Sequence, residues 1–229
     1  MNRTFLKTTL VALVLSFYAL SGLAQDQQDK DWPKYHRYAE KNKEVKGKPT
    51  AVLFGDSITQ NWAKYDQQWL DEHNFVGRGI GGQTTMHLLS RIRQDVIELH
   101  PRYMVLLIGI NDIARNNGYI KVENIFKNIV SIVELAKLNK IKPVMCTVLP
   151  AREIGWRQRV GDPRPSIDSL NILIKDYAKA NRIPLVDYHS AMAMEDGGMN
   201  PAFETDAVHP NLDGYKVMEE ELLKVLKVK

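Results

Sequence analysis

The sequence has very little cysteine: among its 229 residues only Cys146 carries a thiol. A single cysteine can form neither an internal disulfide nor a paired-cysteine metal site. Cys146 lies in an apolar run at residues 143–148, so we expect it to behave as a small buried hydrophobic residue. The histidines show no His-x-x-x-His spacing, and the sequence has no tight cluster of aspartates. The sequence therefore indicates no metal centre.

Long apolar runs and runs of like charge are also scarce. The net charge is +4 without a basic tract, and no segment after the first 24 residues is apolar enough to span a bilayer. We therefore expect no nucleic-acid partner and no stable membrane insertion. Residues 1–24 are different, because Arg3 and Lys7 precede a short apolar stretch that ends in small residues. This pattern is typical of a secretory signal peptide cleaved near Ala24, and it predicts a periplasmic or extracellular protein.

The rest of the chain is organised as an arm followed by one domain. Residues 25–49 are polar with a few aromatic side chains, and we expect an arm with a short helix that packs on the domain at residues 50–229. In this domain, apolar segments bounded by turn residues alternate with segments of helical periodicity. The expected strands are residues 50–54, 74–76, 103–108, 143–149 and 183–186.

These strands are apolar along their whole length, which is typical of a sheet covered on both faces. The sequence therefore predicts the α/β class: a three-layer α/β/α sandwich with a mostly parallel five-stranded sheet, as in flavodoxin-like folds. Two long segments, residues 150–165 and 188–211, are expected to be irregular.

Two polar side chains follow predicted strands directly. Ser57 comes after the first strand in the run Gly55-Asp56-Ser57, and Asn111 comes after the third. Open parallel sheets bind ligands outside the carboxyl ends of their strands, so Ser57 is a candidate nucleophile and Asn111 a candidate donor. The alternative is structural, since Asp56, Ser57 or Asn111 could each satisfy free backbone groups in a turn or helix cap.

Glycines follow the second strand. Gly77, Gly79 and Gly82 fit the pattern G-x-G-x-x-G of dinucleotide-binding loops, but the preceding strand is short, polar and not the first of the fold. A glycine loop at the start of a helix can instead direct free backbone amides at a phosphate or a transient oxyanion. We favour this second interpretation.

His209 differs from the other five histidines in its context. Asp206 precedes it by three residues, close enough to accept a hydrogen bond from one imidazole nitrogen, and Pro210 restricts the backbone after it. A carboxylate in this position holds the tautomer that a general base needs. An ordinary Asp–His contact in a polar loop is the alternative for this pair.

Taken together, these segments resemble the SGNH hydrolases, also called GDSL-type esterases and lipases. Gly55-Asp56-Ser57, Gly81-Gly82-Gln83-Thr84, Gly109-Ile110-Asn111-Asp112 and Asp206-Ala207-Val208-His209-Pro210 stand in the order of the family's sequence blocks. The resemblance implies a nucleophile at Ser57, a base at His209 oriented by Asp206, and an oxyanion hole formed by Ser57, Gly82 and Asn111. The glycine-rich second block is closer to members similar to platelet-activating-factor acetylhydrolase.

The resemblance implies a serine esterase that works through an acyl-enzyme intermediate and needs no cofactor. For an exported enzyme we expect an O-acetylated carbohydrate as substrate, with Trp156 and Arg157 as candidate substrate contacts. A lysophospholipase or short-chain lipid esterase is the alternative, and a ligand-binding module without activity is a third hypothesis. The α/β-hydrolase fold fits less well, because Thr59 occupies the place of the second glycine of its Gly-x-Ser-x-Gly turn.

Overall fold

The computed structural model describes residues 31–226. The predicted signal peptide and the first residues of the predicted arm lie outside this range. The described residues belong to two units, one that ends at His36 and one that begins at Arg37. In the first unit, the Asp31 carboxylate accepts hydrogen bonds from the backbone amides of Tyr35 and His36, both at 2.9 Å.

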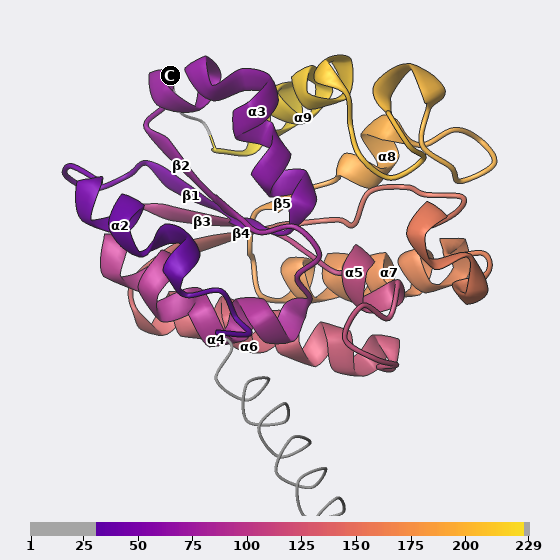
Figure 1. Cartoon of the computed structure of the whole chain (residues 1–229), viewed down its shortest axis with the longest axis horizontal. Helices are drawn as coiled ribbons and strands as arrows, with labels where there is room; N and C mark the ends of the chain where they lie inside the picture. The colour runs from indigo at the N-terminus through magenta and orange to yellow at the C-terminus, as the bar shows by residue number, and fades with distance from the viewer. Residues whose placement is uncertain (1–30, 227–229) are drawn as a thin grey trace, which may run out of the picture. The chain divides into compact units, whose positions relative to one another are not determined.

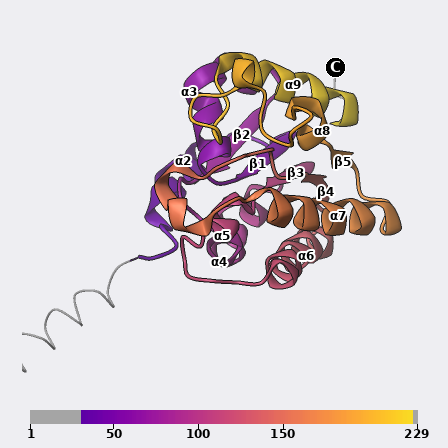
Figure 2. The same cartoon turned by 90° about the vertical axis from the view of Figure 1, so that its right-hand side faces the viewer.

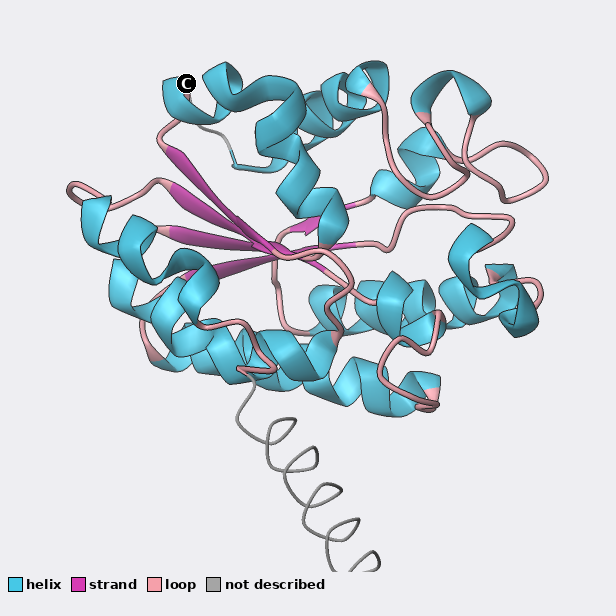
Figure 3. Cartoon of the chain, viewed as in Figure 1, coloured by secondary structure: helices cyan, strands magenta, loops and turns pink. Residues whose placement is uncertain are grey.

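The second unit is built on a five-stranded sheet in which every neighbouring pair of strands is parallel (Figure 3). The strand order is β2-β1-β3-β4-β5. The strands are β1 (Ala51–Gly55), β2 (Phe75–Gly79), β3 (Tyr103–Leu107), β4 (Lys142–Cys146) and β5 (Leu185–Val186). β1 and β3 are buried along their whole length, as their uninterrupted apolar sequences predict.

Helices cover both faces of this sheet (Figures 1 and 2). One face carries α3 (Ser57–Glu72), α8 (Tyr188–Met192) and α9 (Leu212–Leu226). The other carries α4 (Thr85–Asp95), α5 (Ile110–Ile113), α6 (Val122–Leu138) and α7 (Arg164–Ala180). The helix α2 (His36–Glu44) buries Tyr38, whose hydroxyl donates to the Gly79 carbonyl of β2. The predicted three-layer sandwich with a parallel five-stranded sheet is therefore confirmed.

Several local predictions were less accurate. The helix α7 begins at Arg164, within a segment expected to be irregular, and β4 ends at Cys146 instead of residue 149. The segments expected to be irregular contain α8 and the short 3₁₀ helices η2 (Gly155–Val160) and η3 (Pro201–Phe203). The 3₁₀ helix η1 (Ile97–Leu99) separates the end of α4 from Pro101. These short helices could not be recognised in the sequence, because one or two turns are too few to show a helical period.

The expectation for Cys146 is confirmed. Cys146 is a free thiol with 2% of its surface exposed, and burial raises its pKa well above the ordinary value for cysteine. Within residues 31–226, no helix combines the length and the apolar character needed to cross a bilayer.

The strands β1 and β2 end in glycines that have no room for a side chain. A Cβ atom on Gly55 would lie 2.2 Å from Thr59 Oγ1 and 2.4 Å from the Leu107 carbonyl oxygen. A Cβ on Gly79 would lie 2.2 Å from the Gln60 backbone nitrogen. The first turn of α3 therefore packs directly on the backbone of β1 and β2, and this fixes the height of Ser57 above the sheet edge.

This close approach predicts that Gly79→Ala destabilises the fold by at least about 2 kcal/mol, because backbone must move to admit the methyl group. Gly77→Ala is the matched control on the same strand, where the nearest atom to a Cβ is Leu70 Cδ1 at 4.0 Å. Its effect should stay within about 0.5 kcal/mol. Urea unfolding of both variants measures the difference, and equal stabilities would contradict the close approach.

Candidate active site

The structure joins the three predicted residues Ser57, His209 and Asp206 in one chain of hydrogen bonds. Ser57 Oγ lies 2.9 Å from His209 Nε2, and His209 Nδ1 lies 2.8 Å from Asp206 Oδ2. Because a carboxylate only accepts hydrogen bonds, Nδ1 carries the proton and Nε2 is left to accept from the Ser57 hydroxyl. This is the arrangement in which an imidazole can remove a proton from serine.

Ser57 and His209 are 152 positions apart in sequence, and each is held by local structure. Ser57 is the first residue of α3, directly after the end of β1. His209 lies in the loop between η3 and α9, where Glu204 and Pro210 form an isolated antiparallel bridge. In the same loop, Asp206 Oδ1 accepts from the backbone amide of His209 at 2.8 Å. Asp206 therefore orients both the backbone and the ring of His209.

The pKa of Asp206 lies below the ordinary value for aspartate. Burial alone would raise this pKa, but the hydrogen bonds from the amide and ring of His209 and the charge of that ring outweigh burial. The half-exposed Asp206 therefore stays ionised beside the imidazole, and an ionised carboxylate stabilises the imidazolium that forms when serine gives up its proton.

The three predicted oxyanion donors belong to segments that adjoin Ser57. The Ser57 amide belongs to the first turn of α3, where backbone N–H groups have no partner within the helix. Gly82 has φ +78°, and its amide donates to no group within residues 31–226. A Cβ on the preceding Gly81 would lie 3.7 Å from Ser57 Cβ, so this loop is in contact with the serine. Asn111 follows β3, and its side chain is 2% exposed.

The Asn111 amide is fixed in orientation from both ends. Its Nδ2 donates to Asp56 Oδ2 at 3.1 Å, and its Oδ1 accepts from Asn116 Nδ2 at 2.7 Å. One hydrogen of Nδ2 remains for another acceptor. The amides of Ser57 and Gly82 and one hydrogen of Asn111 Nδ2 therefore stay available to an acceptor, as an oxyanion hole requires.

Asp56 supports the turn, as the sequence suggested. It precedes α3 as its N-cap, and its Oδ1 accepts from the Ile58 amide at 3.0 Å. Complete burial raises its pKa to about 7, although the Ile58 amide, His209 and Asn111 each act in the opposite direction. Asp112 is also structural, because its carboxylate accepts from the amide of Thr85 at 2.9 Å and from the hydroxyl of Thr85 at 2.6 Å.

The two predicted substrate contacts differ in their positions. The Trp156 ring lies 5.7 Å from the ring of His209, centroid to centroid, and its Nε1 donates to Asn116 Oδ1 at 3.1 Å. Trp156 is 41% exposed, so one of its surfaces is open beside the imidazole. Arg157 follows in η2, and its buried Nε has no hydrogen-bond partner within the described part of the chain. Among the described residues, no hydrogen bond or ion pair joins Arg157 to Ser57 or His209.

Two further residues that the sequence analysis missed support this site. Asn116 contacts Asn111, Trp156 and the carbonyl oxygen of Gly82, which lies 3.4 Å from its Nδ2. Gln60 Oε1 accepts from the Gly81 amide at 2.9 Å. The spacing of three residues after Ser57 on the predicted helix could have indicated Gln60. Nothing in the sequence around Asn116 singles it out.

The positions of Gly77 and Gly79 disfavour the dinucleotide-binding interpretation of the glycine pattern. Gly77 and Gly79 lie inside β2 and pair with Leu53 and Gly55 of β1, so they do not form a phosphate-binding loop. Within residues 31–226, no three side chains of histidine, cysteine, aspartate or glutamate come together as a metal site. The polar groups of the site are instead arranged around Ser57.

The raised pKa of Asp56 predicts how the stability of the fold depends on pH. The unfolded chain releases this proton near pH 4 and the folded chain releases it at about pH 7, so the native state binds more protons between these values. The free energy of unfolding should therefore fall as pH rises from 4 to 7, by at most about 1.4 kcal/mol per pH unit from this group. Asp56→Asn should remove this slope.

Urea unfolding of the wild type and of Asp56→Asn at several pH values between 4 and 7 tests this expectation. Subtracting the unfolding free energy of the variant from that of the wild type removes the contribution of the other titrating groups, because both proteins contain them. A difference that stays constant across the range would contradict a buried Asp56 that titrates near neutrality.

Comparison with known proteins identifies the family. The model of the GDSL-like lipase/acylhydrolase family matches residues 53–217. A crystal structure of a Bacteroides fragilis protein assigned as an acylhydrolase is 42% identical, with a TM-score of 0.84, and the match covers 87% of this chain and 98% of that one. Among curated relatives, the acetylxylan esterase of Geobacillus stearothermophilus is 24% identical over 153 residues, which cover 65% of this chain and 70% of the relative.

The platelet-activating factor acetylhydrolase IB subunit alpha2 of Rattus norvegicus is 26% identical over 222 residues, which cover 91% of each chain. The resemblance indicated by the sequence blocks is thus confirmed over most of the domain. The chain belongs to the GDSL-like lipase/acylhydrolase family and is a carboxylic ester hydrolase.

Proposed function

We propose that this chain is a serine esterase that removes acyl groups, in the first place acetyl groups, from a carbohydrate through an acyl-enzyme intermediate. The observation that carries the proposal is the hydrogen-bond chain from Ser57 Oγ through His209 to Asp206, with distances of 2.9 and 2.8 Å. An ester hydrolase that attacks directly with water has no need for a serine held on an imidazole in this way.

In the first half of the reaction, Ser57 Oγ attacks the ester carbonyl carbon and His209 Nε2 takes the hydroxyl proton. The carbonyl oxygen becomes negatively charged and accepts hydrogen bonds from the Ser57 amide, the Gly82 amide and Asn111 Nδ2. Each such donor contributes about 3 kcal/mol to lowering the barrier. The tetrahedral intermediate then expels the alcohol, which takes its proton from His209, and the acyl group remains on Ser57.

In the second half, a water molecule takes the place of the alcohol. His209 removes a proton from this water as its oxygen attacks the acyl carbon. The second tetrahedral intermediate breaks its bond to Ser57 Oγ, and His209 returns the proton to the serine. Asp206 holds the Nδ1 proton of the imidazole throughout and stabilises the positive charge that His209 carries after each proton transfer.

Two observations favour a carbohydrate as the alcohol part of the substrate. The exposed Trp156 ring beside His209 offers a flat apolar surface next to polar donors, which suits a sugar ring. A relative of this chain is an acetylxylan esterase. The predicted signal peptide at residues 1–24 also supports an exported enzyme, which would meet extracellular glycans.

A lipid ester is the second candidate. The match to a platelet-activating factor acetylhydrolase subunit extends over 91% of this chain and favours it. Release of acetate from a panel of acetylated sugars and acetylated phospholipids distinguishes the two. Faster turnover of the phospholipids would replace the carbohydrate proposal.

The proposed nucleophile predicts that Ser57→Ala lowers kcat by a factor on the order of 10⁴ or more, because the covalent intermediate cannot form. A fluorophosphonate should label the wild type at Ser57, as located by mass spectrometry, and should not label the variant. The thermal unfolding midpoint of the variant serves as the control for folding. Ester turnover that survives in a folded Ser57→Ala variant would show that another residue is the nucleophile.

The contacts of Asn116 predict a role in positioning Asn111. In Asn116→Asp, two acceptor oxygens would face each other where Asn116 Nδ2 now donates to Asn111 Oδ1 at 2.7 Å. Rotation of the Asn111 amide relieves this repulsion but turns its oxygen toward the developing oxyanion. We therefore expect kcat to fall about tenfold, a loss of roughly 1.4 kcal/mol, with little change in KM.

Trp156→Phe is the matched comparison, because it removes only the donor to Asn116 and keeps a ring beside His209. Its kcat should stay within about threefold of the wild type. A pair of variants with equal losses in kcat, or an Asn116→Asp enzyme with wild-type kcat, would rule out the positioning role.

A further inference from the structure

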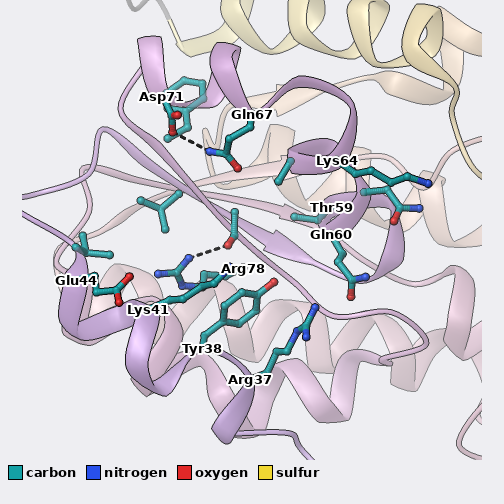
Figure 4. Close-up of a pocket in the computed structure, with 16 residues that line it drawn as sticks. Arg37, Tyr38, Lys41, Glu44, Thr59, Gln60, Lys64, Gln67, Asp71 and Arg78 are labelled. Carbon is teal, nitrogen blue, oxygen red and sulfur yellow. Dashed lines mark hydrogen bonds between the residues drawn. The ribbon is translucent and has the colours of Figure 1, made fainter.

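A cavity of about 710 Å³ lies beside the proposed active site, between α2, the first half of α3 and the edge strand β2 (Figure 4). Its walls include Tyr38 and Lys41 from α2 and Gln60 and Lys64 from α3. Its floor is formed by the end of β2, where the Arg78 guanidinium lies 4.8 Å from the centre of the Tyr38 ring. None of these residues has a role in the mechanism above.

Gln60 connects the cavity with the proposed nucleophile Ser57. Gln60 is three residues after Ser57 on α3, which corresponds to about 4.5 Å along the helix axis. Its Oε1 is occupied by the Gly81 amide at 2.9 Å, and Gly81 is in contact with Ser57. This bond fixes the side-chain amide, so that Nε2 is the atom of Gln60 left to donate to a ligand.

The charges in the cavity are unevenly distributed. Arg37, Gln60 and Lys64 lie toward one end of the view, and Glu44 and Asp71 lie toward the other (Figure 4). Lys64 and Asp71 lie on opposite sides of the break in α3 at Asp66, where the backbone leaves the helical conformation (φ −151°, ψ 69°). Asp71 also accepts from Gln67 Nε2 at 2.7 Å, so its charge is partly satisfied.

Arg37 and Lys64 make no ion pair with any residue in the described range 31–226. Lys64 has instead a contact with the ring of Tyr65, with its Nζ 5.5 Å from the ring centre. Two cations without carboxylate partners, next to a free amide donor and close to a nucleophile, form a site that favours an anionic group on the substrate.

We propose that this cavity binds an acidic carbohydrate, so that the ester cleaved at Ser57 is carried by a glycan with carboxylate groups. The proposal rests on the proposed serine esterase function and narrows its substrate class. A carboxylate of a sugar next to the esterified one pairs with Arg37 and Lys64, and sugar hydroxyls accept from Gln60 Nε2. Polar side chains dominate this end of the cavity, which offers sugar hydroxyls more partners than a lipid chain would find.

The test compares acetylated oligosaccharides of a uronic acid with acetylated neutral xylo-oligosaccharides of the same length. We expect the wild type to prefer the acidic substrate in kcat/KM. In the double variant Arg37→Gln/Lys64→Gln, the ratio of acidic to neutral kcat/KM should fall about tenfold, as expected for the loss of two exposed charge pairs. Raising the salt concentration should reduce the wild-type preference in the same direction.

Lys43→Gln is the matched control, because Lys43 is an exposed lysine of α2 that does not line the cavity and pairs with Glu40. Its ratio should equal that of the wild type. A wild type without a preference for the acidic substrate, or a double variant with an unchanged ratio, would overturn the proposal. A double variant that loses activity only on acidic phospholipid vesicles would also overturn it, in favour of a lipid headgroup.

Hydrolysis of p-nitrophenyl acetate by the wild type separates this proposal from the proposed function. If the wild type cleaves this small neutral ester but does not prefer acidic sugars, the esterase assignment holds and the cavity proposal fails. If it does not cleave the ester and Ser57 is not labelled by a fluorophosphonate, the proposed function itself fails.

Discussion

The buried guanidinium of Arg91 forms hydrogen bonds with the chain segments next to Ser57. Its Nη2 donates to the Gly55 carbonyl at the end of β1, and its Nε donates to Gln83 Oε1 at 2.6 Å. Its Nη1 pairs with Asp95 at 2.8 Å, so the charge is neutralised within α4 itself. An unpaired charge at this depth would destabilise the fold by several kcal/mol. Because Asp95 pairs with Arg91, the guanidinium can stay buried and hold the Gly55 carbonyl and the Gln83 side chain in place.

The Gly82 amide is also held in a fixed orientation. The Gly81 amide donates to Gln60, and the Gly82 carbonyl accepts from Asn116, so the peptides on both sides of the Gly82 N–H are held. Gly82 can adopt its positive φ without a steric penalty. A donor fixed in advance needs no reorganisation when negative charge develops, and this is the main source of stabilisation in an oxyanion hole.

The sequence predicted the parts of the site that depend on local patterns. The strand before Ser57 is a continuous apolar run, and Asp206 and His209 are close in sequence, so both could be recognised from neighbouring residues alone. Asn116 could not, because its contacts with Asn111, Gly82 and Trp156 depend on how separate loops meet. The glycine pattern that includes Gly79 was ambiguous for a related reason: sequence does not reveal whether a glycine forms a loop or, as Gly79 does, admits a neighbouring backbone.

The two residues that support the proposed site, Asn116 and Gln60, come from different elements and face different environments. Asn116 connects the oxyanion donors to the exposed Trp156, whereas Gln60 connects the glycine loop to the cavity that contains Arg37 and Lys64. The acetyl group of the proposed substrate is small and offers few contacts of its own, so discrimination between such substrates must come from the alcohol side. Since Gln60 both fixes Gly81 and lines that cavity, a sugar that accepts from Gln60 Nε2 would bind to the same side chain that holds the loop of the proposed oxyanion donor. In this arrangement, binding energy from the alcohol can raise kcat as well as lower KM.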